Sequence, residues 1–163
     1  MPVPRRPGWL LRTRQDGYHS PMTDATPFDR FAESLDGPML IVTTAAADGP
    51  AGCLVGFATQ TSIDPPRFLV CLSRPNRTAR VAEHAEHLCV HLVPRSNRRL
   101  AEHFGGVTGD DADKFSGVAW TKGPYGLPVL EECPRWFAGR ILDRVDLGDH
   151  VGYLLDPQEG SVR

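Results

Sequence analysis

The segment from Gly56 to Leu72, GFATQTSIDPPRFLVCL, is the feature that most restricts the fold of this chain. Two extended stretches flank a polar turn that closes with Pro65 and Pro66. Adjacent prolines have no amide hydrogen to donate to a sheet, and each restricts the backbone conformation of the residue before it. The turn must therefore lie outside the strands. The next segment, Ser73 to Thr78, predicts the start of a helix. This layout predicts a rigid sheet that presents backbone groups and hydroxyls to a flat, phosphorylated ligand.

Short apolar runs separated by turns recur along the chain. Glycine and proline contribute 16 and 15 of the 163 residues, and together with strand patterns this is typical of a turn-rich β protein. The expected strands are Met39 to Ala46, Ala51 to Thr61, Phe68 to Leu72, Leu88 to Val93, Trp136 to Val145 and Val151 to Leu155. No regular β-α-β alternation is visible. We therefore predict a mainly β (α+β) fold, an antiparallel barrel with short flanking helices.

Three helices are expected between these strands. Thr26 and Pro27 form a good helix entry, with Thr26 as the N-cap and proline in the first position. Asn76 is expected to cap the second helix and Ser96 the third. The residues from Gly105 to Phe115 are expected to form a polar loop, and those from Trp120 to Leu130 an irregular segment, because of their glycines and prolines.

The first residues differ from the rest. Residues 1–23 are rich in arginine and proline and show no sustained periodicity, so we expect a disordered N-terminal arm there and one domain over residues 24–163. Arg5 and Arg6 resemble part of a twin-arginine signal, but the apolar stretch behind them is too short for one.

Charge and cysteine use limit the partners. The formal net charge is −2, so there is no basic excess to neutralise a nucleic acid, and we expect no nucleic-acid partner. No run approaches the roughly 18 apolar residues of a membrane span, so no membrane partner is expected either. The four cysteines are scattered and mostly lie in apolar strand patterns, which indicates buried free thiols and a cytoplasmic protein.

Common catalytic and metal motifs are absent. The chain lacks a GxGxxG turn, a phosphate-binding P-loop and a GxSxG elbow. His84, His87 and His91 span a helix end and a strand start, so they need not converge on a metal. The acidic residues Asp110 to Asp113 lack the glycine and the terminal glutamate of a calcium loop. We expect no metal site.

Two turns carry the most chemistry. Ser73, Asn76, Arg77 and Thr78 form the best anion site, since a helix start points free N–H groups and its positive dipole end at the turn. Plain capping with surface arginines explains the same residues equally well. His150, in the Gly148-Asp149-His150 turn, is either a ligand-contacting histidine or part of a turn that satisfies its own backbone.

The order of these motifs resembles the flavin reductase-like family of small FMN-binding split barrels. The segments that carry the resemblance are DGPAGCLVGFATQTSIDPPRFLVCL, SRPNRTARVAEHA, LAEHFGG, DKF and GDH, and the similarity as a whole covers nearly everything from Phe28 to Leu155. The loop differs from the frequent family pattern in having Gln60 and Thr61 where a pair of serines is common. The resemblance implies a split barrel, a homodimer, and flavin bound near the subunit interface.

The resemblance also implies which residues bind the cofactor. Those along the isoalloxazine ring would be Gly56, Phe57, Ala58 and Thr59, and those beside the ribityl chain or pyrophosphate would be Thr61, Ser62 and Ile63. The phosphate would be held by Ser73, Asn76, Arg77 and Thr78, and the pocket flanked by Phe104, Gly105, Lys114 and Phe115. His150 matches the histidine associated with the nicotinamide donor.

The activity implied is NAD(P)H-dependent reduction of FMN or FAD, by hydride transfer to flavin N5, with reduced flavin used in place or passed to a monooxygenase component. Two alternatives remain. One is a flavin-binding module or carrier without its own reductase activity. The other is a related split-barrel enzyme that uses a deazaflavin or oxidises a pyridoxamine-type substrate.

Overall fold

The computed structural model describes residues 25–47 and 49–163, and it separates the chain after Gly37 into two units. The predicted disordered arm, residues 1–23, lies outside the described residues. In the first unit, helix α1 (Pro27–Ser34) begins as the sequence predicts. The Thr26 hydroxyl accepts a hydrogen bond from the Asp29 amide, and the Asp29 carboxylate accepts one from the Thr26 amide. This reciprocal pair is a capping box.

The second unit, Pro38–Arg163, contains the sheets and the other helices. Its elements are β1 (Leu40–Ala46), β2 (Gly49–Val55), β3 (Ala58–Ser62), β4 (Arg67–Ser73), α2 (Arg77–Ala82), β5 (His87–Leu92), α3 (Arg98–Gly106), β6 (Trp120–Lys122), the 3-10 turn η2 (Pro124–Gly126), β7 (Pro128–Leu130), β8 (Arg135–Asp146) and β9 (His150–Val162). Seven strands form one antiparallel sheet in the order β2-β1-β5-β8-β9-β4-β3, and β6 pairs with β7.

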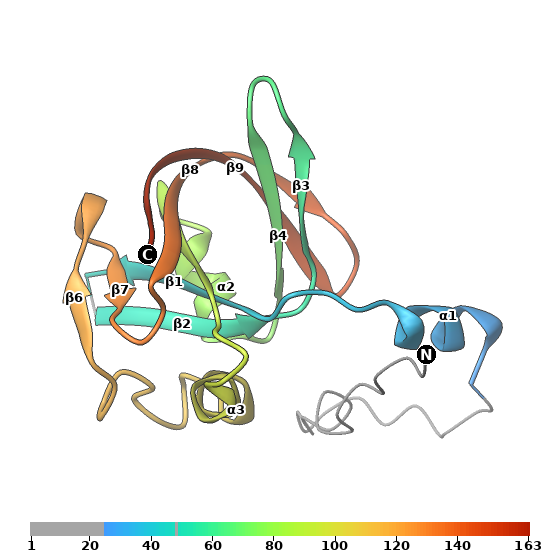
Figure 1. Cartoon of the computed structure of the whole chain (residues 1–163), viewed down its shortest axis with the longest axis horizontal. Helices are drawn as coiled ribbons and strands as arrows, with labels where there is room; N and C mark the ends of the chain where they lie inside the picture. Colours follow the sequence, from blue (N-terminus) through green and yellow to red (C-terminus); the bar gives the residue numbers. More distant parts are fainter. Residues whose placement is uncertain (1–24, 48) are drawn as a thin grey trace. The chain divides into compact units, whose positions relative to one another are not determined.

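The seven-stranded sheet curls into a split barrel (Figure 1). Strands β2 and β3 follow each other in sequence but form its two opposite edges, so Gly56 and Phe57 must carry the chain across the gap. The Phe57 carbonyl accepts a hydrogen bond of 2.9 Å from the Cys71 amide, which starts the pairing with β4 before β3 begins. The predicted fold class is confirmed: an antiparallel split barrel with short flanking helices.

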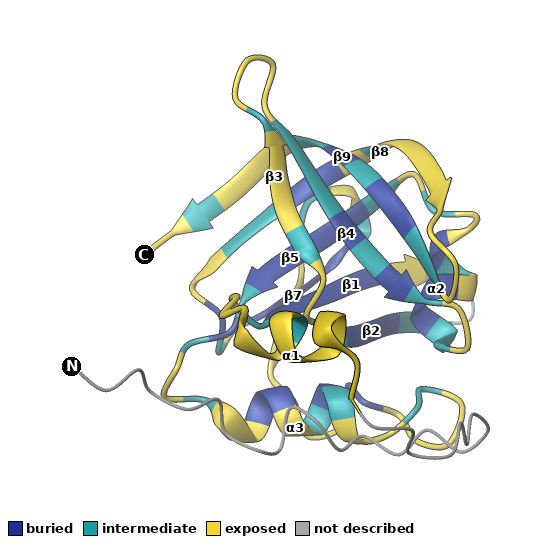
Figure 2. Cartoon of the chain, turned by 90° about the vertical axis from the view of Figure 1, so that its right-hand side faces the viewer, coloured by how far each residue is buried: buried dark blue, intermediate teal, exposed yellow. Residues whose placement is uncertain are grey.

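One core fills the concave side of this sheet. Leu72 of β4, Leu88 of β5 and Tyr153 of β9 are fully buried in it, together with residues of β1 and β2. Figure 2 shows these inward-facing stretches as dark blue segments of the strands. Helix α2 packs Ala79 and Ala82 against the same core, and the Tyr153 hydroxyl donates to the Ala79 carbonyl at 3.2 Å. The start of α2 is therefore held in a set place beside the ends of β4 and β9.

The hairpin of β6 and β7 covers part of the opposite, outer face of the sheet. It buries Cys89 and Ala138 beneath Leu127 and Val129. His91 lies in the same layer and fastens the hairpin. Its Nδ1 lies 3.0 Å from the Ile41 carbonyl and its Nε2 accepts a hydrogen bond from the Leu130 amide at 3.2 Å. These partners assign the hydrogen to Nδ1 of a neutral ring.

Three predicted strand limits are wrong. The expected single strand from Ala51 to Thr61 is divided at Gly56 and Phe57, because the chain changes from one sheet edge to the other there. The expected irregular segment from Trp120 to Leu130 contains the β6–β7 pair. The last strand continues to Val162, because β8 offers it a partner along its whole length and a register shift accommodates Pro157.

Two predicted helix limits also need correction. Helix α3 is capped by the side chain of Asn97, which accepts from the Leu100 amide at 3.2 Å, and not by Ser96. It also continues through Gly105 and Gly106, which were expected to begin a loop. Gly105 packs closely on β2, since a Cβ there would lie 2.8 Å from Leu54 Cδ2. Tertiary packing here outweighs the low helix propensity of glycine.

The buried His91 predicts a pH dependence of stability. Burial lowers the pKa of His91 to about 4, from an ordinary value of 6.5. Below pH 6.5 the unfolded chain therefore binds a proton that the folded chain refuses. We expect the free energy of unfolding to fall by roughly 3 kcal/mol as the pH decreases from about 6.5 to about 4.

Urea unfolding across this pH range tests the prediction. His91→Gln should remove this part of the pH dependence, and His84→Gln, the same change at an exposed histidine, should retain it. Equal pH profiles for the wild type and His91→Gln would contradict the prediction.

Candidate functional site

Phe57, Ser73 and His150, from distant parts of the sequence, lie together on the outer face of the sheet. Ser73 of β4 pairs with His150 of β9. Because Leu72 points into the core, the next residue along β4 points outwards. The centroids of the Phe57 and His150 rings are 5.0 Å apart, and Phe57 is 63% exposed. The fold thus brings a predicted ring-contacting residue, a predicted phosphate residue and the predicted donor histidine to one open face.

The neighbouring carboxylate orients His150. Asp149 Oδ1 lies 2.7 Å from His150 Nδ1 and accepts its hydrogen. This hydrogen bond lowers the pKa of Asp149. Among the residues that the structure describes, no hydrogen bond engages His150 Nε2. The imidazole therefore presents Nε2 as its nitrogen for a ligand.

The segment from Ser73 to Thr78 forms a tight turn into α2. The Asn76 side chain accepts a hydrogen bond from the Thr78 amide at 3.3 Å, and the Asn76 amide donates to the Ser73 carbonyl at 3.0 Å. The predicted Asn76 cap is confirmed. Thr78 is buried at the start of the helix. Capping thus accounts for Asn76, and a phosphate-binding role for the turn stays a prediction.

The arginine side chains in and beside this turn already have partners within the protein. Arg77 donates to the Pro50 carbonyl at 3.0 Å, and Arg80 forms an ion pair with Asp110. Arg74 donates to the Gly148 carbonyl at 2.7 Å. An anion in this region would have to share or replace these partners.

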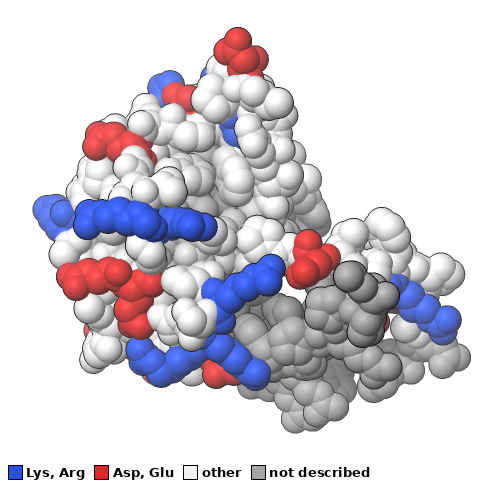
Figure 3. Space-filling view, in the orientation of Figure 1, with Lys and Arg blue, Asp and Glu red and all other residues white. Residues whose placement is uncertain are grey.

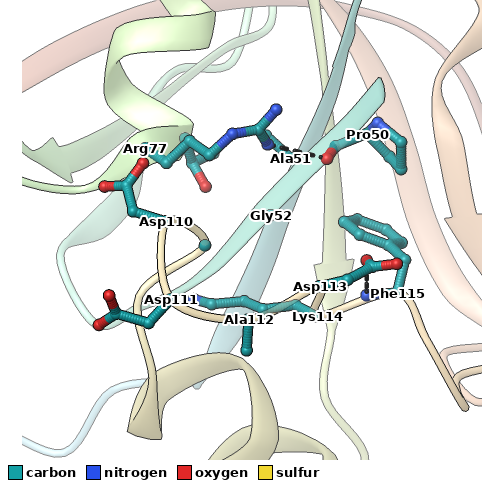
Figure 4. A pocket seen from close by; sticks show the side chains of 12 residues that line it. Pro50, Ala51, Gly52, Arg77, Asp110, Asp111, Ala112, Asp113, Lys114 and Phe115 are labelled. Carbon is teal, nitrogen blue, oxygen red and sulfur yellow. Dashed lines mark hydrogen bonds between the residues drawn. The ribbon is translucent and has the colours of Figure 1, made fainter. Parts of the chain in front are cut away.

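A pocket of about 370 Å³ lies between the start of β2, the start of α2 and the loop before β6 (Figure 4). Arg77 and Thr78 line one side, and Lys114 and Phe115 line the other. Figure 4 shows the Arg77 side chain extending towards Pro50, with the loop that carries Lys114 opposite. Four predicted cofactor residues from two separate segments are therefore brought together in one cavity.

Lys114 is the buried cation of this cavity. Its Nζ donates to the Phe104 carbonyl at 2.8 Å, in the last turn of α3. Burial lowers the pKa of Lys114, and the same environment raises the pKa of Cys53 to about 11. No carboxylate among the described residues forms an ion pair with Lys114. A buried ammonium without a matching anion is stabilised by an anionic ligand.

Other predicted site residues lie elsewhere. Phe104 is fully buried and packs its ring on Phe115, so its side chain supports the pocket from within the core. Gly105 faces Leu54 of β2. Ile63 is 85% exposed in the β3–β4 turn. Ala58 packs towards the core, while Thr59 and Thr61 are exposed along edge strand β3, with Ser62 at its end. Gly56 is exposed in the link between β2 and β3.

Several residues of the site were not predicted from sequence. The strand start Pro50 to Gly52 and the loop Gly109 to Asp113 line the cavity. Asp149 orients His150, and the only sequence signal for it is its place directly before the histidine. The described residues contain no group of three or more His, Cys, Asp or Glu side chains placed to hold a metal ion. On the face drawn in Figure 3, acidic and basic side chains are interspersed.

The family of the chain follows from comparison with known proteins. Residues 32–163 match the flavin reductase like domain family, and the chain belongs to that family. The resemblance recognised in the sequence is confirmed. None of the helices in the described part of the chain is long and apolar enough to cross a membrane.

Curated relatives have reductase names. The chain is 34% identical over 131 residues to the FMN reductase (NADH) RutF of Bradyrhizobium diazoefficiens, covering 79% of this chain and 72% of that protein. It is 32% identical over 114 residues to the stachydrine N-demethylase reductase subunit Stc3 of Rhizobium meliloti, covering 68% of this chain. The chain spans 48% of the length of Stc3, so the activity of that whole protein does not transfer directly.

Solved structures share the fold. A flavin reductase domain protein from Arthrobacter sp. FB24 superposes with a TM-score of 0.70 at 26% identity, covering 77% of this chain and 76% of that one. An FMN-binding protein from Thermus thermophilus superposes with a TM-score of 0.72, covering 76% of this chain and 70% of that one, and at 22% identity it supports the fold alone.

Close packing beneath the pocket predicts the effect of one substitution. A Cβ at Gly52 would lie 3.0 Å from Phe104 Cε1 and 3.2 Å from Phe115 Cζ. We expect Gly52→Ala to force these rings apart and to lower the free energy of unfolding by roughly 1–3 kcal/mol. Gly106→Ala is the matched control, because a Cβ there meets nothing within 4 Å. Chemical unfolding of both variants measures the difference, and equal stability would show that the rings move without cost.

Proposed function

We propose that this chain is an NAD(P)H-dependent flavin reductase that transfers a hydride from nicotinamide C4 to flavin N5. The observation that carries the proposal is the meeting of Phe57, Ser73 and His150 on one open face of the sheet. Membership of the flavin reductase like family and the relative named FMN reductase (NADH) support it.

The residues present fit a flavin mononucleotide. The exposed ring of Phe57 offers an apolar contact to a flat ligand. Among the described residues β3 pairs only with β4, so its other edge offers backbone groups to a ligand, and the side chains of Thr59 and Thr61 are exposed on the same strand. The unmatched ammonium of Lys114 suits the anionic end of the molecule. A flat apolar contact, an edge of hydrogen-bonding groups and a buried cation are the features that such a ligand requires.

We assign the two ends of the cofactor accordingly. The isoalloxazine ring is assigned to the segment from Gly56 to Thr59. Thr61 to Ile63 were expected beside the ribityl chain, but Ser62 pairs with Arg67, at the opposite end of β4 from Ser73, so these residues do not lie between the ring and the phosphate. The phosphate is assigned to the turn residues Ser73, Asn76, Arg77 and Thr78, with Lys114 as the nearby buried cation of the cavity. The Asn76 cap and the burial of Thr78 give this turn a fixed geometry before any ligand binds.

Bound flavin would supply the electron-accepting ring, and the protein supplies binding and orientation. Hydride transfer needs no general acid or base on the chain, so closeness of the two rings accounts for most of the rate. Phe57 and the edge of β3 hold one ring, and His150 holds the donor. The Asp149 carboxylate keeps the hydrogen on His150 Nδ1, which leaves Nε2 to accept a hydrogen bond from the nicotinamide carboxamide.

The partners proposed are a second copy of this chain and a monooxygenase component in the cytoplasm. The chain is 30% identical to a protein named 4-hydroxyphenylacetate 3-monooxygenase reductase component from Escherichia coli, covering 73% of that protein. The open outer face around Phe57 suits cover by a second subunit, which would exclude water from the reacting rings.

Replacement of His150 tests the donor site. We expect His150→Ala to raise the KM for NADH about 10-fold while the affinity for FMN changes less than twofold, since one hydrogen bond to the donor is lost. Steady-state NADH oxidation with FMN, together with fluorescence titration of FMN, measures both. His84→Ala is the matched control at an exposed histidine.

The same assays decide between the proposal and its alternative. Wild-type protein that binds FMN but does not accelerate oxidation of NADH or NADPH would indicate a flavin carrier. Protein that binds no flavin at all would reject both. Comparison of NADH with NADPH, and of FMN with FAD, identifies the preferred pair.

A further inference from the structure

The turn that carries His150 is held at two places: Ser73 of β4 pairs with His150 itself, and Arg74 contacts the rest of the turn. The turn joins β8 to β9 and comprises Asp146 to His150. Within it, the Leu147 amide donates to the His150 carbonyl at 3.0 Å and the Gly148 amide donates to Asp146 Oδ1 at 3.0 Å. Gly148 has a φ of 93°, a conformation that suits glycine. The side chains of Asp146 and Asp149 are largely exposed, so the core does not fix the turn.

Arg74 makes three separate contacts with this turn. Its backbone amide donates to the Asp149 carbonyl at 3.0 Å. Its Nε donates to the Gly148 carbonyl at 2.7 Å, and its guanidinium lies 2.8 Å from Asp146 Oδ1. Asp146 Oδ1 thus accepts from both the Gly148 amide and Arg74. The Arg74 side chain therefore connects Asp146 and Gly148, and its backbone amide adds a contact to Asp149.

The ion pair alone is weak. The side chains of Arg74 and Asp146 are 43% and 80% exposed, so solvent screens their attraction. The hydrogen bond to a main-chain carbonyl matters more, because it fixes the path of the turn itself. The two side-chain contacts also restrict the turn more than contacts from two residues would, since ordering a single side chain serves both.

Arg74 lies in the segment to which the phosphate is assigned. It directly follows Ser73 and precedes Asn76, whose amide bonds back to the Ser73 carbonyl. Arg74 therefore joins the segment assigned to the flavin phosphate to the turn whose His150 is assigned to the nicotinamide donor. Movement of the turn away from β4 would carry His150 away from Phe57.

We propose that Arg74 is a positioning residue for the hydride donor: it fastens the Asp146–His150 turn to the cofactor segment and so sets the place of His150. This proposal rests on the proposed function. Arg74 contacts neither ring and acts through His150. It is thereby distinguished from a phosphate ligand, which would act on flavin affinity.

Kinetics of matched variants test the proposal. We expect Arg74→Ala to raise the KM for NADH about fivefold, with kcat at saturating NADH and the Kd for FMN each changed less than twofold, because the hydrogen bond to Gly148 and the exposed ion pair with Asp146 are lost while the backbone contact to Asp149 is kept. Arg74→Lys should fall between wild type and alanine, since it keeps the charge but cannot bond two acceptors in a fork. The control is Arg99→Ala, which removes an exposed arginine of α3 that is paired with Glu132. This variant should match the wild type.

Two further readouts separate positioning from a general loss of structure. Hydrogen exchange at the amides of Leu147 and Gly148, which are both hydrogen-bonded within the turn, should accelerate in Arg74→Ala and not in Arg99→Ala. The KM effects of Arg74→Ala and Asp146→Ala should combine in the double variant to less than their product, because both act on the same turn.

The outcomes distinguish this proposal from the proposed function. A wild type that oxidises NADH, with Arg74→Ala indistinguishable from Arg99→Ala, overturns the positioning role and leaves the reductase intact. An Arg74→Ala variant that loses FMN affinity at unchanged KM for NADH makes Arg74 a phosphate ligand and also overturns it. A wild type without NADH oxidation removes the proposed function and the donor role of Arg74 together, even where exchange shows the turn to be loosened.

Discussion

The covalent link between β2 and β3 is the constraint on which the site depends. These two strands form opposite edges of the seven-stranded sheet, so Gly56 and Phe57 can join them only if the sheet curls until its edges approach. The curling encloses the core, and it places the two linking residues at the rim of the barrel. Phe57 then starts the pairing with β4 and turns its ring onto the outer face, where His150 meets it.

Uneven cover of the outer face decides where a ligand has room. Over β1, β5 and β8 the β6–β7 hairpin packs down, and His91 and Thr43 bond directly to it. Over β4 and β9 the described residues leave Ser73 and His150 only partly covered. The same sheet thus supports a second buried layer at one end and is open at the other, where the site is proposed.

Much of the architecture was predictable because its signals are local. The Thr26 capping box, the Asn76 cap and the apolar strands depend on residues within a few positions of each other. Strand limits were less predictable, because pairing with distant partners decides them. The last strand was expected to end at Leu155, and the long partner β8 keeps it paired to Val162. Gly105 argued for a loop, and only Leu54 shows why glycine is needed inside α3.

The order of the motifs along the chain was enough to recognise the family and to name Phe57, Ser73 and His150 as members of one site. The sequence by itself therefore determined the family and which residues are candidates for the site. It could not determine that Phe104 lies in the core beneath the pocket, that Lys114 is a buried cation without an ion-pair partner among the described residues, or that Arg74 holds the histidine turn. Those facts depend on contacts between segments many residues apart, and only the closing of the sheet brings such segments together.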